Sequence, residues 1–267
     1  MIANSRTNTT FSISAFLISD GPAGFLLSWV AGFVDTAAFI VLFGLFTAHV
    51  TGNLALAGSF FAKSDEGSTV TRLLMIPTFM TAVALTSLLA RHARRRKWPV
   101  LAVLLTAEAV ALSIFMWVGT RLSPALIFDV QQNLILPIGV TGVIAMAIQN
   151  ALMKEAKGAF KSYIPTTVMT GNTTQLTIDL VQFFSAKLSS RSNELPNPEA
   201  EEALERMSRT IPILVGFVFG GAAAAYFVPM AEFWSLALPL MAVCILAVAA
   251  YTQHNQAYAN ALNPDAH

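Results

Sequence analysis

Long apolar runs, separated by short polar segments, dominate the chain. A membrane-spanning helix needs about 20 mostly apolar residues, because each residue covers about 1.5 Å of a hydrocarbon layer about 30 Å thick. Only Asp35 and Glu108 are charged within the stretches that reach this length, which are residues 22 to 47, 73 to 90, 98 to 119, 133 to 153, 210 to 231 and 233 to 253. The pattern therefore predicts an all-α, polytopic membrane protein with about six transmembrane helices.

Two further segments, residues 49 to 62 and 166 to 186, are apolar but ambiguous. The first is short, and the second carries several polar side chains, which are Asn172, Gln175, Asp179 and Gln182. Either segment could cross the membrane, or could dip into it and return. We interpret both as half-helices or short helices.

The distribution of basic residues favours six crossings over eight. Lys and Arg accumulate on the cytoplasmic side of membrane proteins. If neither ambiguous segment crosses, 13 of the 16 basic residues lie on one side, whereas two further crossings divide them evenly. We predict a single membrane domain at residues 22 to 253, with tails at 1 to 21 and 254 to 267 that both face the cytoplasm.

Composition agrees with a membrane location and narrows the function. Of 267 residues, 55% are hydrophobic and 12% charged, with a mean hydropathy of +0.62 and a net charge of +1; soluble domains carry about 25% charged residues. The lipid bilayer is therefore the expected partner, and nucleic acid is not. Cys244 is the single cysteine, and no catalytic or nucleotide-binding motif is present. We expect no enzyme and no cofactor; an intramembrane enzyme would depend on Asp35, Glu108 and His49 alone.

An internal repeat is suggested by two copies of the triplet Thr-Gly-Asn. HVTGN ends at Asn53 and VMTGN ends at Asn172, 119 residues later. Before them, GFVDT aligns with AIQNA, which pairs Asp35 with Asn150. The predicted repeats span about 22 to 119 and about 133 to 253, with three crossings each. An odd number of crossings inverts the second repeat, as in many transporters.

The motifs AGFVDTAAFIVLFGLFTAHVTGN and VMTGNTTQLTIDL resemble the YoaK-like family of bacterial inner-membrane proteins. The resemblance extends over residues 22 to 253, although the second half departs more from the pattern. It implies a multi-pass protein of the cell inner membrane, and the family has no established activity.

Asp35 and His49 are the first candidates for a functional site. An ionised carboxylate inside a membrane costs a few kcal/mol unless it is paired or hydrated, so we expect Asp35 to contact a solute or a proton. His49 is the expected proton partner, because its ordinary pKa lies near neutrality. Alternatively, Asp35 is a neutral acid that only bonds a neighbouring helix. Glu108 is the second intramembrane carboxyl candidate.

The Thr-Gly-Asn triplets are the other candidates, through Thr51, Asn53, Thr170 and Asn172. The N-terminus of a helix carries partial positive charge, so two such ends near the midplane would attract an anion or a polar solute. Alternatively, both triplets are only helix caps and packing contacts.

These observations favour a secondary transporter or exporter of a small polar or anionic solute, with contacts from Asp35, Asn53, Asn150 and Asn172. Coupling of transport to protons is a further hypothesis. A channel-like pore and a scaffold that binds a partner protein remain the alternatives. Gly216 and Gly220 form a small-residue motif that favours packing within the bundle, although a homo-oligomer stays open.

Overall fold

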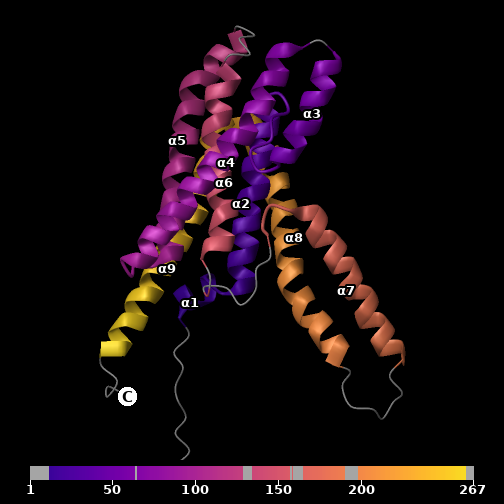
Figure 1. Ribbon diagram of the computed structural model, residues 1–267, viewed down its shortest axis with the longest axis vertical. Coiled ribbons are helices and arrows are strands. Elements are labelled where there is room, and N and C mark those ends of the chain that lie inside the picture. Colours follow the sequence, from indigo (N-terminus) through magenta and orange to yellow (C-terminus); the bar gives the residue numbers. More distant parts are fainter. Residues whose placement is uncertain are drawn as a thin grey trace, which may run out of the picture.

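The computed structural model describes residues 12–63, 65–128, 134–156, 158, 165–189 and 198–262, and its regular structure there is entirely helical. Figure 1 shows a bundle of long helices. The elements are α1 (Ile13–Leu17), α2 (Asp20–Val41), α3 (Val50–Ala62), α4 (Glu66–Arg95), α5 (Val100–Phe128), α6 (Ile135–Glu155), α7 (Met169–Ser189), α8 (Pro198–Ala231), the 3-10 helix η2 (Glu232–Leu236) and α9 (Ala237–Leu262).

Five continuous helical stretches are long and apolar enough to cross a membrane in the described residues. They are Asp20–Val41, Gly67–Arg95, Val100–Ser123, Ile135–Glu155 and Pro198–Ala261. The last has 64 residues, about three times the length that one crossing needs. It breaks at η2, where Glu232 has a φ of 44°, and α8 and α9 run in opposite directions (Figure 1). All six predicted stretches are therefore helical, and the chain is a multi-pass membrane protein.

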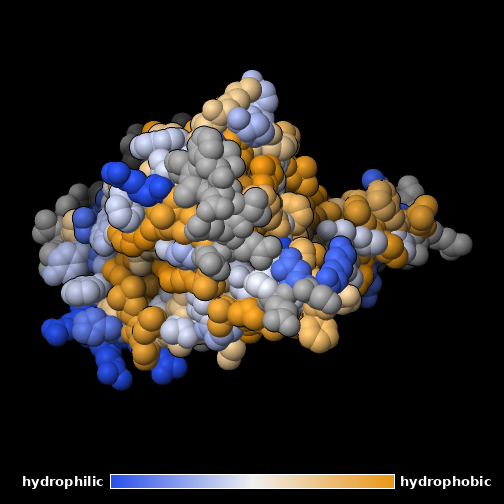
Figure 2. Space-filling view, turned by 90° about the horizontal axis from the view of Figure 1, so that it is seen from above, coloured by the Kyte–Doolittle hydropathy of each residue, from blue (hydrophilic) through white to orange (hydrophobic). Residues whose placement is uncertain are grey.

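The outer surface is as apolar as this location requires. Met80, Val218 and Val248 are each more than 60% exposed. Figure 2, which looks down on one end of the bundle, shows large orange areas and a few separate groups of blue side chains. Such apolar exposure is unfavourable in water and ordinary against lipid tails.

Several boundaries differ from the sequence prediction. The first long helix ends at Val41, not at residue 47, because Phe43 and Gly44 adopt positive φ values of 53° and 80°. Within the predicted tails, α1 is helical and packs on α9, and α9 continues to Leu262. The contact is polar as well: the Gln253 Nε2 lies 3.0 Å from the Ser12 hydroxyl. Residues 1–11, 133 and 263–267 of the predicted segments lie outside the described residues.

The two ambiguous segments are helices that begin at or beside the Thr-Gly-Asn triplets. α3 has 13 residues and is therefore about 20 Å long, too short to cross a bilayer. α3 packs on α4 and α7 packs on α8. In Figure 1, α3 rises from the middle of the bundle and α7 descends from it, so the two helices run in opposite directions.

Glycines bring α2 and α8 into backbone contact. A Cβ at Gly220 would lie 2.1 Å from the carbonyl oxygen of Trp29, and one at Gly216 would lie 2.4 Å from that of Phe25. Later residues of α8 contact later residues of α2, so the two helices run parallel. The predicted small-residue motif is thus used within the chain, where close backbone approach provides dispersion energy that lipid contact would not replace.

Gly220→Ala should lower the free energy of unfolding by about 1–3 kcal/mol, because a methyl group there overpacks the α2–α8 contact. Thermal unfolding in detergent measures the effect. Gly58→Ala is the matched control, since nothing lies within 4 Å of its Cβ position and Ala is the better helix former. Equal stability of the two variants would contradict the proposed packing.

Candidate functional site

Asp35 holds the segment that connects α2 to α3. This carboxylate is 3% exposed, and its Oδ1 accepts hydrogen bonds from the backbone amides of Thr47 and Ala48, both at 2.7 Å. The Thr47 hydroxyl donates to the same oxygen at 3.3 Å. We name Asp35, Thr47, Ala48 and His49 the Asp35 cluster. Because the chain leaves its helix here inside the apolar bundle, the carboxylate supplies partners that lipid cannot supply.

His49 completes the Asp35 cluster. Its Nδ1 lies 2.5 Å from the Asp35 Oδ2, and its side chain is 33% exposed. The imidazole ring makes edge contacts with Phe46 and with Phe217 of α8, at centroid distances of 5.9 and 5.7 Å. The pair therefore joins a buried carboxylate to a group that reaches the surface of the protein.

Asn53 fixes the same segment from the first turn of α3. Its Oδ1 accepts from the Phe46 amide at 2.9 Å, and its Nδ2 donates to the Phe46 carbonyl at 2.7 Å. Asn53 is completely buried. Both ends of the amide are engaged by the chain itself, so its direct role in this structure is to position the start of α3.

Asn172 makes the corresponding contact at the start of α7. Its Nδ2 donates to the Pro165 carbonyl at 2.7 Å, and like the Asn53 contact it reaches seven residues back. On α6, Asn150 accepts from the Thr167 hydroxyl at 2.5 Å and donates to the Met146 carbonyl at 2.9 Å. We name Asn150, Thr167 and Asn172 the Asn150 cluster.

A buried polar contact that the sequence analysis did not predict links this second segment to α2. Gln149 is 0% exposed; its Nε2 donates to the Leu27 carbonyl at 2.5 Å and to the Thr166 hydroxyl at 3.2 Å. Ser28 donates to the carbonyls of Thr166 and Ile213, at 3.2 and 2.7 Å. α2, α6, α8 and the start of α7 are thus connected at one level.

A signal for the connecting residues was present in the sequence. Thr47 and Thr166 each stand four residues before the Thr of a Thr-Gly-Asn triplet. Both are buried in the segments that lead into α3 and α7, residues 42–49 and 165–168, which we name the two bends. The two segments differ in charge: His49 is the residue two before Thr51, whereas Val168 is the residue two before Thr170. Only the first segment therefore carries a titratable pair among the residues discussed.

The remaining predicted residues lie apart from these clusters or at their edges. Thr51 and Thr170 are exposed at the starts of α3 and α7. Glu108 is completely buried on α5, and neither carboxylate oxygen has a hydrogen-bond partner in the structure. Since α5 packs mainly on α6 and α9, Glu108 is not brought to α3 or α7.

Asp179, one of the polar residues of the second ambiguous segment, binds a neighbouring helix. It is fully buried and pairs with Arg206 of α8, Nε to Oδ1, at 2.8 Å, and Gln175 donates to the same oxygen at 3.0 Å. This ion pair joins α7 to α8. No cluster of three or more His, Cys, Asp or Glu residues able to hold a metal is found in the part of the chain described.

Comparison with known proteins places the chain in a family. A family model described as "Protein of unknown function (DUF1275)" matches residues 23–250, so the chain belongs to that family. A relative, the "UPF0700 transmembrane protein YoaK" of Bacillus subtilis (strain 168), is 32% identical over 91 residues. The match covers 34% of this chain and 40% of that protein. No solved structure matches. The expected resemblance to YoaK-like proteins is confirmed.

Asn53→Ala should release the segment between α2 and α3, because it leaves the amide and carbonyl of Phe46 without partners. Unsatisfied buried groups cost about 1–3 kcal/mol. We expect faster hydrogen exchange in residues 42–49 and a lower unfolding temperature. Thr177→Ala is the control, since that exposed hydroxyl bonds only Thr173 of its own helix. Unchanged exchange in the Asn53 variant would contradict a positioning role.

Proposed function

We propose that this member of the DUF1275 family is a transporter of a small polar or anionic solute, with its site between two inverted, pseudo-symmetric halves. The observation that carries the proposal is the pair α3 and α7, which begin inside the apolar bundle and run in opposite directions (Figure 1). Helices that begin at membrane depth and run toward opposite sides are a recurring transporter design.

The internal repeat is part of the proposal, and the helix order supports it. α2 to α5 would correspond to α6 to α9, with α3 (13 residues) and α7 (21 residues) as the helices that begin inside the bundle. Equivalent pairs pack together: α8 lies on α2 and α4 on α6, while α3 lies on α4 and α7 on α8. Asn53 and Asn172 each bond a carbonyl seven residues earlier. Two halves built from one repeat would both contain this seven-residue contact.

The starts of α3 and α7 suggest the class of solute. Thr51, Thr170 and Gly171 are exposed there, next to backbone amides that have no partner within their own helix. Helix N-termini favour negative charge. Asn53 and Asn172 would shape the site by holding the bends, and Thr51, Thr170 and the outer edge of His49 would contact the solute.

Proton coupling through Asp35 and His49 completes the proposal. A carboxylate that accepts three hydrogen bonds from the α2–α3 connection would weaken its hold when it takes up a proton, since a neutral acid is the poorer acceptor. His49, which is partly exposed, would pass the proton to Asp35. Protonation would thereby loosen the start of α3.

Asp35→Asn should abolish the pH dependence of solute flux into proteoliposomes, because the amide cannot exchange the proton. Asp65→Asn is the control, since Asp65 caps α4 outside the Asp35 cluster. Flux that keeps its pH dependence in the Asp35 variant would refute the coupling. Flux that rises linearly with concentration, without saturation, would identify a pore instead of a transporter.

Measurements of the protein's thermal stability can identify the solute. A ligand at 100 times its Kd stabilises the folded state by about 2.7 kcal/mol. Screening anionic and neutral polar metabolites against the purified protein should yield a hit that Thr170→Val weakens. Absence of any stabilising solute across pH would favour the scaffold alternative.

The inner-membrane location and the six-crossing topology are also part of the proposal. In a Cys244→Ser background, Lys63→Cys at the end of α3 should react with an impermeant maleimide in intact cells. Ser185→Cys on α7 should react only after the membrane is opened. Labelling of Ser185→Cys in intact cells would mean that α7 crosses.

A further inference from the structure

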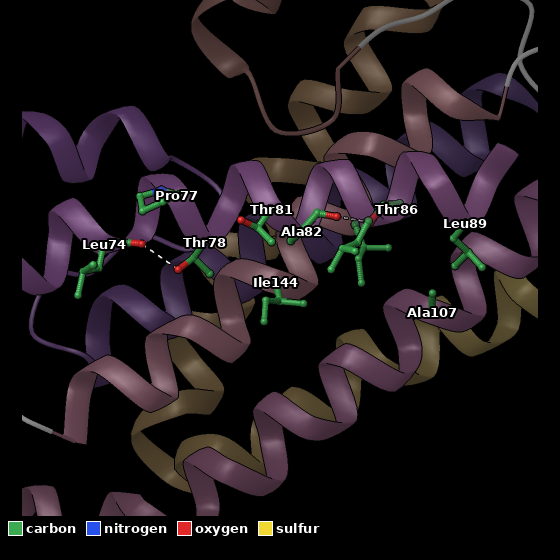
Figure 3. A pocket seen from close by; sticks show the side chains of 11 residues that line it. Leu74, Pro77, Thr78, Thr81, Ala82, Thr86, Leu89, Ala107 and Ile144 are labelled. Carbon is green, nitrogen blue, oxygen red and sulfur yellow. Dashed lines mark hydrogen bonds between the residues drawn. The ribbon is translucent and has the colours of Figure 1, made fainter. Parts of the chain in front are cut away.

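An apolar groove runs along α4 on the side that faces α5 and α6. It encloses about 560 Å³. Figure 3 shows α4 residues along one wall, with Ile144 of α6 and Ala107 of α5 opposite. The hydroxyls of Thr78 and Thr86 donate to carbonyls of their own helix, so the polar atoms of these two residues are already satisfied. The groove therefore suits a hydrocarbon chain.

The groove contrasts with the closely packed contact between α2 and α8. Glycines of α8 let the backbones of α2 and α8 touch, so that no groove remains between these two helices. Between α4 and α6 no glycine of α4 plays this part, and Pro77, Thr81 and Leu85 line a space that stays empty of protein atoms. A membrane protein exposes such a space to lipid tails, because the bilayer surrounds it.

A basic segment, residues 91 to 97, lies directly beyond one end of the groove and comprises the end of α4 and the start of the α4–α5 loop. Leu89 lines the groove, and Arg96 follows it by seven residues, on the same helix face and about 10 Å further along. This segment carries five Arg or Lys. Arg94 is neutralised by Glu155 of α6, at 2.6 Å.

Three other basic side chains of this segment are free to bind an anion. Arg95, Arg96 and Lys97 are exposed and have no ion-pair partner among the described residues. Trp98 follows them, 50% exposed, with its ring 5.7 Å from the ring of His92. An exposed Trp beside basic residues is typical of the headgroup level of a bilayer.

We propose that the groove and the basic segment together form a binding site for one anionic phospholipid. An acyl chain occupies the groove between α4, α5 and α6, and the phosphate of the headgroup is bound by Arg95, Arg96 and Lys97. Charge complementarity selects this occupant, since basic pockets between transmembrane helices bind anionic headgroups. The site is separate from the Asp35 and Asn150 clusters and does not rest on the transport proposal.

Native mass spectrometry of the full-length protein in detergent tests the proposal, with phosphatidylglycerol and phosphatidylcholine of identical acyl chains as probes. The wild-type protein should retain phosphatidylglycerol in preference to phosphatidylcholine. Each basic residue near an anionic lipid contributes roughly a factor of five, so R95Q/R96Q/K97Q should lose about a hundredfold in affinity for phosphatidylglycerol. The control K63Q/R121Q/K187Q removes the same charge at exposed residues outside the groove and the basic segment.

A second variant tests the groove. Thr81→Trp fills it and should weaken both lipids, whereas Met80→Trp, on the adjacent exposed position of α4, should weaken neither. Equal retention of both lipids by wild type, or full selectivity in R95Q/R96Q/K97Q, would each overturn the proposal. If Thr81→Trp does not fold, the basic-segment variant and its control decide the result.

Discussion

Backbone groups that leave a helix inside a membrane must find partners within the protein, and the structure depends on how this chain meets that requirement. Water is absent there, and each unsatisfied amide or carbonyl costs several kcal/mol. The segment between α2 and α3 meets the constraint through Asp35 and Asn53, which together bind the backbone of Phe46, Thr47 and Ala48. Arg72 of α4 adds a bond to the Phe43 carbonyl of the same segment, at 2.7 Å.

The α2–α8 contact gives both bends a common support. Glycines allow the two helices to touch along their length, and Ser28 then reaches carbonyls of both Thr166 and Ile213. Gln149 adds a bond from α6 to α2. The segment that leads into α7 is thus bonded directly to α2 and α6, while the start of α3 is fixed to α2 and touches α8 through His49. Movement of α8 along α2 would therefore affect both bends at once.

The two bends share a backbone design and differ in charge. Asp35 and His49 form a titratable pair at the first, whereas Asn150 and Thr167 provide neutral partners at the second. A transporter with one titratable bend would respond to pH on one side of the site and keep the other side constant. The groove proposed for a lipid lies elsewhere, between α4, α5 and α6, so bilayer composition would act on the bundle and not on the solute directly.

The sequence by itself determined the membrane class, the long apolar helices and the starts of α3 and α7, because these follow from local hydrophobicity and from short motifs. It also singled out two ionisable residues, Asp35 and His49, and three amides, Asn53, Asn150 and Asn172. Tertiary structure alone decided that α2 ends at Val41, that Asn53 and Asn172 bind their own bends, and that Asp179 pairs with Arg206. It also placed Gln149, Ser28 and Glu108. These outcomes depend on contacts between segments up to 185 residues apart, and hydrophobic periodicity carries no information about which distant carbonyl a buried side chain will meet.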